Sequence, residues 1–146
     1  AMATSTLIQF LAAGEAGDTS HRRQVETYIA AGTIAAGDVV AFDDSQTGAD
    51  RALYVEQAGI VATGNGLAAG VALDGAAAGE QVRVIVAGYA EDVSCAGGVG
   101  TGAVVNAAGT AAGQVEAAAA TDTIVFGVTV EAEAGGTVDL IVYKRF

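Results

Sequence analysis

The sequence predicts an all-β fold: a compact β-sandwich or barrel-like domain with an internal duplication and an N-terminal arm. Composition is the first reason, because 34 of the 146 residues are alanine, 21 are glycine, 19 are valine and none is proline. This bias favours strands joined by glycine turns over helices packed through leucine. Pattern is the second reason. Short valine-rich runs recur between glycine-containing turns as far as the C-terminus, as they do in sandwiches and barrels.

Residues 1–32 are predicted to form an arm that ends in a short strand. The arm begins with a small apolar cluster, continues through a polar stretch around Gly14 and Gly17, and then carries a basic triplet. At residues 25–29, β-branched side chains alternate with Glu and Tyr, which is the period of a strand. The candidate contact residues of the arm are Leu7, Ile8, Phe10, Leu11, His21, Arg22 and Arg23.

Residues 33–146 are predicted to form a single β domain. Each of its apolar runs is short, rich in valine and bounded by turn residues, which is the signal of a strand. The expected strands cover residues 38–42, 52–55, 70–73, 82–86, 103–105, 114–116, 124–130 and 137–143. Cys95 lies between the acidic pair Glu91 and Asp92 and two glycines, and we assign this segment to a loop. Its acidic neighbours would raise the pKa of the thiol.

The β domain contains two similar series of runs. The sequence Gly-Asp-Val-Val at residues 37–40 is matched by Gly-Ala-Val-Val 65 residues later, at 102–105. The sequence Gly-Val-Ala-Leu at residues 70–73 is matched by Gly-Val-Thr-Val 57 residues later, at 127–130. A shortened loop accounts for the difference between the two offsets. We therefore predict a duplication in which half-units at residues 33–88 and 98–146 close one core.

The charge balance and the single cysteine exclude several classes of protein. Seventeen acidic residues against six basic ones give a formal net charge of −11, which repels nucleic acid and anionic membranes. No apolar run approaches the roughly 18 residues of a membrane span. One cysteine can form neither an internal disulfide framework nor a cysteine metal cluster. The fold must therefore depend on packing or on oligomerisation, and neither a nucleic acid nor a membrane is expected as a partner.

The sequence contains no recognisable catalytic, cofactor or metal motif. Its glycine strings lack the spacing of dinucleotide-binding and phosphate-binding loops, and it has no nucleophile elbow. The single imidazole, His21, lies in the polar arm, where no burial is expected. Residues 43–50 resemble the start of a calcium loop, but Tyr54 occupies the position that requires a bidentate carboxylate. We therefore expect a protein that is not an enzyme and that uses no cofactor.

Several segments resemble small decoration proteins, also called cement proteins, of phage heads. The likeness lies in the spacing of Gly, Ala and Val and extends over residues 22–146. The segments that carry it are residues 22–30, 34–40, 70–74, 78–84 and 127–130. The resemblance implies a β-rich homotrimer on the outside of a capsid, at three-fold or quasi-three-fold points. It also implies an N-terminal arm that clamps neighbouring subunits of the major capsid protein.

The function that follows from this resemblance is structural. The chain is expected to be made in the host cytoplasm, to bind the outer surface of a phage head as a trimer and to stabilise it. One alternative is an accessory or carrier β-barrel of an enzyme complex, but the single lysine, Lys144, is not at a hairpin tip as a carrier requires. Another alternative is a hydrolase that uses paired carboxylates.

Overall fold

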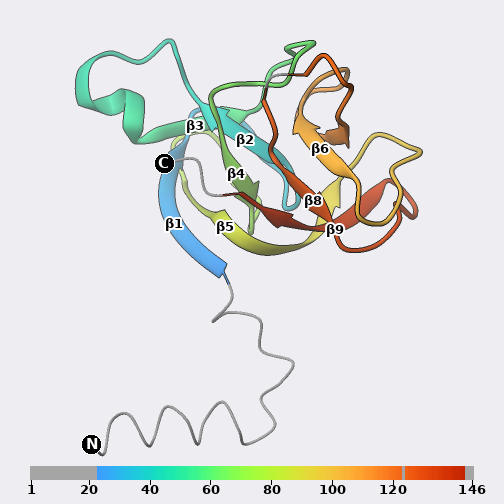
Figure 1. Cartoon of the computed structure of the whole chain (residues 1–146). Helices are drawn as coiled ribbons and strands as arrows, with labels where there is room; N and C mark the ends of the chain where they lie inside the picture. The colour runs from blue at the N-terminus through green and yellow to red at the C-terminus, as the bar shows by residue number, and fades with distance from the viewer. Residues whose placement is uncertain (1–22, 123, 144–146) are drawn as a thin grey trace, which may run out of the picture.

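The computed structural model describes residues 23–122 and 124–143, and within them the fold is all-β, as predicted (Figure 1). One short 3-10 helix, η3 (Gly48–Ala52), accompanies the strands. No helix in this part of the chain is long and apolar enough to cross a membrane. The strands are β1 (Arg23–Ala30), β2 (Val39–Phe42), β3 (Tyr54–Gln57), β4 (Ala68–Ala72), β5 (Gln81–Ser94), β6 (Val104–Ala107), β7 (Val115–Ala117), β8 (Gly127–Thr129) and β9 (Thr137–Val142).

The first five strands form a closed barrel. Strands β1, β3, β2, β4 and β5 pair in that order, and β5 pairs back to β1. The β1–β3 pairing is parallel, and the other pairings are antiparallel. Because the barrel is closed, each of these strands has a neighbouring strand on both sides. Strand β1, which the sequence places at the end of the arm, is thus one wall of this first barrel.

The remaining strands form a second barrel that shares β5 with the first. The C-terminal part of β5 pairs with β9, and β9, β8, β6 and β7 follow in order. A parallel bridge between Cys95 and Val115 returns β7 to the end of β5 and closes the ring. Gly88 pairs with both Arg23 and Val142, so β5 passes from one barrel to the other there. Its φ of 91° is one that favours glycine.

The loop predicted around Cys95 begins later than expected, because β5 continues through Glu91 and Asp92 to Ser94. Cys95 forms an isolated bridge, and residues 96–103 lie outside the strands. The pairing register with β9 shifts between Ala90 and Val93, and Asp92 has a φ of 50°. Such a bulge places two exposed acidic residues inside a strand without interrupting it. The polar pair therefore looked like a turn in the sequence although the ladder resumes immediately after it.

The strand register repeats between the two barrels, although β1 and the end of β5, which belong to the barrels, lie outside the predicted half-units at residues 33–88 and 98–146. Val40 pairs with Gly70 in the first barrel, and Val105 pairs with Gly127 in the second. These residues are separated by the two offsets, 65 and 57, that the sequence repeats show. The bridge between Cys95 and Val115 likewise repeats the parallel pairing of Ala30 with Val55. The order of strands along the chain is the same in both barrels. The first barrel has β1, then the paired strands β2 and β3, then the paired strands β4 and β5. The second has the end of β5, then β6 and β7, then β8 and β9.

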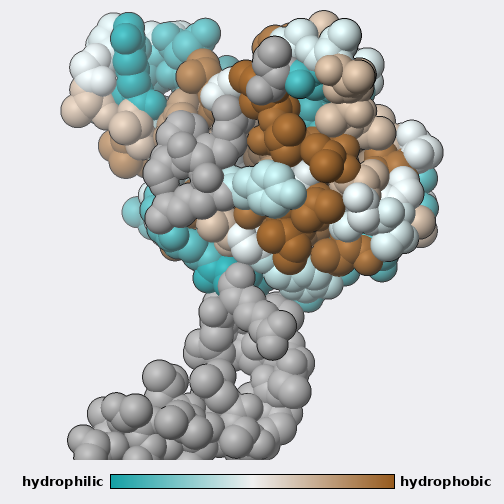
Figure 2. All heavy atoms as spheres, in the orientation of Figure 1, coloured by the Kyte–Doolittle hydropathy of each residue, from teal (hydrophilic) through white to brown (hydrophobic). Residues whose placement is uncertain are grey.

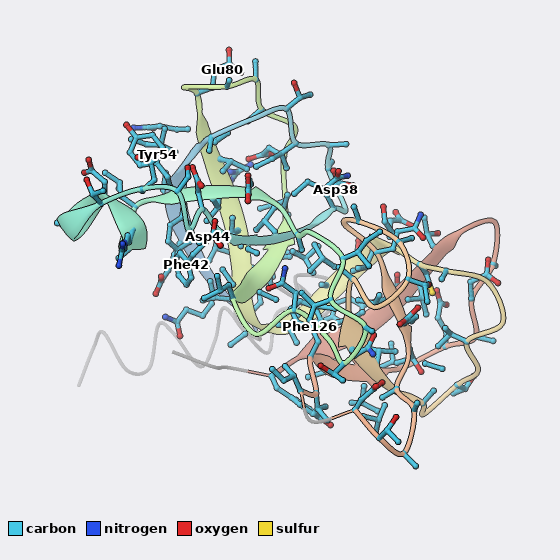
Figure 3. All side chains as sticks on the ribbon, turned by 90° about the horizontal axis from the view of Figure 1, so that it is seen from above. Asp38, Phe42, Asp44, Tyr54, Glu80 and Phe126 are labelled. Atoms are coloured by element: carbon cyan, nitrogen blue, oxygen red, sulfur yellow. The ribbon has the colours of Figure 1, made fainter. Side chains whose placement is uncertain are left out.

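Each barrel has its own apolar interior. The first contains Tyr28, and the second contains Phe126, which is fully buried. The sticks in Figure 3 show Phe126 on the second barrel, away from Phe42, Asp44 and Tyr54 on the first. The cluster around Phe126 also includes Val39, Ala41, Ala58, Ala68, Val71 and Ile85. Strand alternation places Val39 and Ala41 of β2, with the paired Val71 and Ile85, on the outside of the first barrel, so the second barrel covers that outer face.

Candidate functional site

Most of the predicted arm contacts lie outside the described residues. This applies to Leu7, Ile8, Phe10, Leu11, His21 and Arg22, so the arm as a contact site stays a prediction. Arg23 begins β1, is half-buried and pairs with Gly88. It lines a cavity of about 260 Å³ together with Glu91 and Asp92. The last basic residue of the predicted arm thus lies beside two carboxylates of the strand that joins the barrels.

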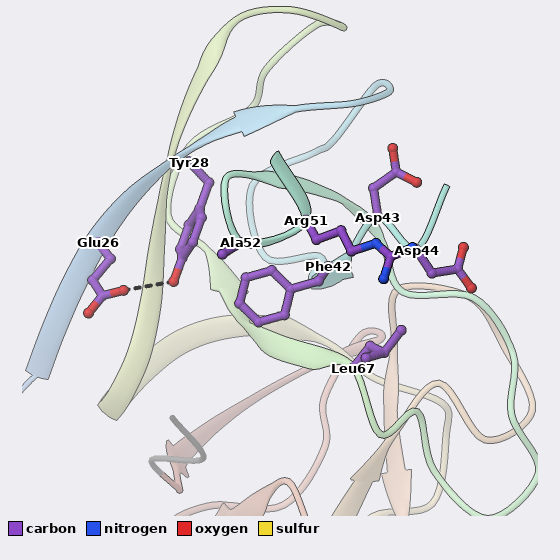
Figure 4. A pocket seen from close by; sticks show the side chains of 8 residues that line it. All are labelled: Glu26, Tyr28, Phe42, Asp43, Asp44, Arg51, Ala52 and Leu67. Atoms are coloured by element: carbon purple, nitrogen blue, oxygen red, sulfur yellow. Dashed lines mark hydrogen bonds between the residues drawn. The ribbon is translucent and has the colours of Figure 1, made fainter. Parts of the chain in front are cut away.

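A larger recess opens on the first barrel beside Phe42 (Figure 4). Its volume is about 650 Å³, and β1, β2 and η3 form much of its wall. The rings of Tyr28 and Phe42 meet edge to face with centroids 5.7 Å apart, and the Tyr28 hydroxyl donates a hydrogen bond of 2.7 Å to Glu26. Burial and this bond raise the pKa of Tyr28 well above its ordinary value. The recess is lined by Glu26, Tyr28, Phe42, Asp43, Asp44, Arg51, Ala52 and Leu67.

Three carboxylates gather near this recess, and two of them, Asp43 and Asp44, line it. Oxygen atoms of Asp43, Asp44 and Glu56 lie within 4.8 Å of one another. Asp43 accepts hydrogen bonds from the Ser45 hydroxyl at 2.6 Å and the Gln46 amide at 2.8 Å, and these bonds lower its pKa. Partial burial, followed by the charges of Asp43 and Asp44, raises the pKa of Glu56. The carboxylate oxygens of Asp43 thus accept hydrogen bonds from residues of the same turn, as is common for aspartate.

An exposed apolar surface lies on the second barrel. Val104 of β6 pairs with Val128 of β8, which pairs with Ile141 of β9, so the three side chains form one row. Val104 is 43% exposed, and the other two are half-buried. Figure 2 shows hydrophobic residues gathered over β8 and β9. We call this surface the β8 face and define it by Val104, Val125, Val128, Val130, Ile141 and Tyr143.

The β8 face and the recess could not be predicted from the sequence. The strands that carry them were predicted, but alternation alone does not say which outer face another barrel covers. A usable signal was present in the repeat. Val104 and Val128 match Val39 and Val71 in the first half, and all four are valines at positions that face away from their own barrel interior.

The described polar groups form no nucleophile–base pair of the kind sought in the sequence. His21 and Lys144, the only histidine and lysine of the chain, lie outside the described residues. The thiol of Cys95 is buried and donates to the Ala96 carbonyl oxygen at 3.0 Å. Burial, with a smaller contribution from Glu133, raises its pKa to about 11. The thiol therefore stays protonated at neutral pH and is a poor nucleophile.

Comparisons with known proteins identify a shared fold. No protein-family model matches the chain, and no curated protein matches it. Among solved structures, the chain is similar to the N base of head fiber gp8.5 of bacteriophage phi29, with 20% sequence identity and a TM-score of 0.53. The match covers 82% of this chain and 93% of that chain. The double barrel described above is therefore a fold that this chain shares with the base of a phage head fiber.

Proposed function

We propose that this chain is a structural protein of a phage head, which binds the outside of the capsid as a homotrimer and stabilises it. The observation that carries the proposal is the fold shared with a head fiber base over 93% of that protein's chain. The segments that resemble head decoration proteins point to the same location in the virion. Its partner would be the major capsid protein, with further contacts between copies of the chain itself.

Surface chemistry supports a structural role. The net charge of −11 keeps a crowded particle soluble and discourages adsorption to nucleic acid. The β8 face and the recess beside Phe42 provide apolar surface that a partner can bury. Neither surface combines a buried nucleophile with a base. The carrier alternative gains no support, because no lysine is present among the described turns.

The arm is proposed to be the anchor on the capsid. Residues 1–22 lie before β1, and when extended they span about 70 Å, at about 3.3 Å per residue. Leu7, Ile8, Phe10 and Leu11 would enter an apolar groove of the capsid. His21, Arg22 and Arg23 would meet acidic side chains at its margin.

The experiment that tests this function is binding to purified heads. Heads that lack the protein, from the phage that encodes it, are mixed with the purified full chain and pelleted. We expect saturable binding with stoichiometric occupancy, density on the outer surface by electron microscopy, and rupture of the heads at a higher temperature. Failure of the full chain to bind heads at micromolar concentration would overturn the proposal.

A further inference from the structure

Strand β1 has an open edge over most of its length. It pairs with β3 only at Ile29 and Ala30. Over Arg23–Tyr28, β5 is its only partner among the described strands. An open edge of this kind can accept a further strand through main-chain hydrogen bonds.

The hydrogen bonds of β1 show which of its residues face this edge. The backbone N–H of Ile29 donates to the carbonyl oxygen of Leu53, just before β3, at 3.0 Å. Successive residues of a strand direct their N–H and C=O groups to alternate sides. Thr27 and Val25, two and four residues earlier, therefore direct these groups to the same side as Ile29. No described strand pairs with them there.

The recess beside Phe42 adjoins this edge (Figure 4). Glu26 and Tyr28, alternate residues of β1, line it, and Phe42 and Leu67 supply further apolar wall. Val25 belongs to the opposite face of β1 and is 37% exposed. A strand added to the open edge would therefore meet apolar side chains on both of its faces.

The arm contains a segment with the chemistry of such a strand. Residues 4–11 read Thr-Ser-Thr-Leu-Ile-Gln-Phe-Leu and contain no charge, glycine or proline. They are compatible with an extended conformation, and their burial desolvates no charge. In a strand, Ile8 and Phe10 share one face, and Leu7 and Leu11 share the other. Each face of this segment thus carries two apolar side chains.

The connection between this segment and β1 is long enough to reverse direction. Residues 12–22 span up to roughly 36 Å when extended, at about 3.3 Å per residue. They include Gly14 and Gly17, which allow turns. A segment tethered in this way reaches its site at an effective concentration of about millimolar. It therefore has the advantage over a separate partner at micromolar concentration.

We infer that, in the free protein, residues 4–11 of the chain's own arm bind as a strand along the open edge of β1. Ile8 and Phe10 enter the recess, and Leu11 lies beside Val25. The occupant is the arm of the same chain, because the arm joins β1 at this edge and its apolar faces match both surfaces. In the proposed function, on which only this step rests, the arm leaves the recess when its side chains enter the capsid.

Hydrogen exchange tests the strand contact. In the free full chain, the amide protons of Val25 and Thr27 should be protected, although no described strand pairs with them. Phe10→Asp places a charge in the recess and should raise both exchange rates by at least about tenfold. The matched control, Ala16→Asp, adds the same charge to the connection and should leave both rates unchanged. Circular dichroism confirms that the barrels of both variants are folded.

Disulfide trapping identifies the chain that supplies the strand. Leu67 lines the recess and is 45% exposed. In a Cys95→Ala background, Phe10→Cys with Leu67→Cys should form a bond under mild oxidation, and mass spectrometry should show one chain with both thiols consumed. The matched control, Phe10→Cys with Glu80→Cys, uses an exposed position beside the other end of β1 and should stay reduced.

Three results would overturn the inference. The first is equal exchange of Val25 and Thr27 in the wild type and Phe10→Asp, with no Phe10–Leu67 bond above the control. The second is protection of these two amides that appears only on heads, because a capsid segment would then occupy the edge. The third is a disulfide that joins two chains, because the strand would then come from a neighbouring copy.

These measurements separate the inference from the proposed function, because they use the free protein. A chain that shows both effects but binds no heads would leave the arm contact standing and remove the function. Head binding by a chain that shows neither effect would do the reverse. In a chain that binds heads, the Phe10–Leu67 bond should weaken binding by at least about tenfold, and reduction should restore it. Unchanged binding of the locked chain would contradict release of the arm.

Discussion

Gly70 and Gly127 occupy the same place in the two barrels, each with its Cα against the carbonyl oxygen of an isoleucine on the neighbouring strand. A Cβ atom on Gly70 would overlap the Ile85 oxygen, and one on Gly127 would overlap the Ile141 oxygen. In both cases the obstacle is backbone, which cannot turn away as a side chain can. The glycine is therefore a requirement for close strand pairing in each barrel.

Alanine at either glycine should destabilise the protein by about 1–3 kcal/mol, the range for overpacking a well-packed site. We expect Gly70→Ala and Gly127→Ala to lower the urea midpoint at a fixed protein concentration. Gly100→Ala is the control, because nothing lies within 4 Å of a Cβ at that position. Equal midpoints for Gly127→Ala and Gly100→Ala would contradict the close approach.

Phe126 should be the most costly single truncation in the second barrel. It is the largest fully buried side chain among the described residues, and Phe→Ala changes in cores cost about 3–5 kcal/mol. Its neighbour Val125 is 38% exposed, so Val125→Ala should change the free energy of unfolding much less. Urea unfolding of the two variants side by side measures the difference. A cost for Phe126→Ala no larger than that for Val125→Ala would mean that the second core is not packed around this ring.

The thiol of Cys95 should react slowly and should make stability depend on alkaline pH. Its pKa rises from 9.0 to about 11 in the folded protein, so at pH 8 the folded thiolate fraction is about a hundredfold below that of the unfolded chain. Because the folded state holds the proton more tightly, this contribution is complete below pH 9 and is lost as the pH rises towards 11. Alkylation rates in buffer and in urea check the first part.

The dependence of stability on alkaline pH is checked by unfolding curves measured between pH 8 and pH 11. The Cys95→Ala variant lacks the titrating group, so its stability should fall less between pH 9 and pH 11 than that of the wild type. Identical pH profiles for the two proteins would show that the thiol is not shielded as its burial indicates.

Removal of residues 2–20 should leave the assembly intact and sharply weaken binding to heads. Four apolar side chains in this segment could each contribute roughly 1.5–3 kcal/mol when buried on a partner. Reversing the charges of Arg22 and Arg23 should weaken binding more at low salt than at high salt, because the Debye length is about 10 Å at 0.1 M. Pelleting with heads at two salt concentrations measures both effects. Unchanged affinity of the truncated protein would move the anchor from the arm to the barrels.

The sequence predicted the features that depend on local chemistry. The glycines at 70 and 127 and the valine runs beside them repeat because close strand pairing demands them, so the duplication could be read directly. The continuity of β5 could not be predicted, since Glu91 and Asp92 have the composition of a turn and only the bulge keeps them in the strand. The difference in burial between Val39 and Val104 could not be predicted either, because burial of an outer face depends on what packs against it.

The arrangement of β5 has a consequence for how the molecule comes apart. Two barrels joined only by a linker would unfold independently, each at its own melting temperature. Here Gly88 lies on a backbone segment that is a wall of both, so separating either barrel removes hydrogen-bond partners from the other. We expect one calorimetric transition whose van't Hoff and calorimetric enthalpies agree for the assembled unit. Partial unfolding from one end of the chain is therefore disfavoured, because detaching β1 or β9 removes hydrogen bonds from β5, the strand that both barrels share.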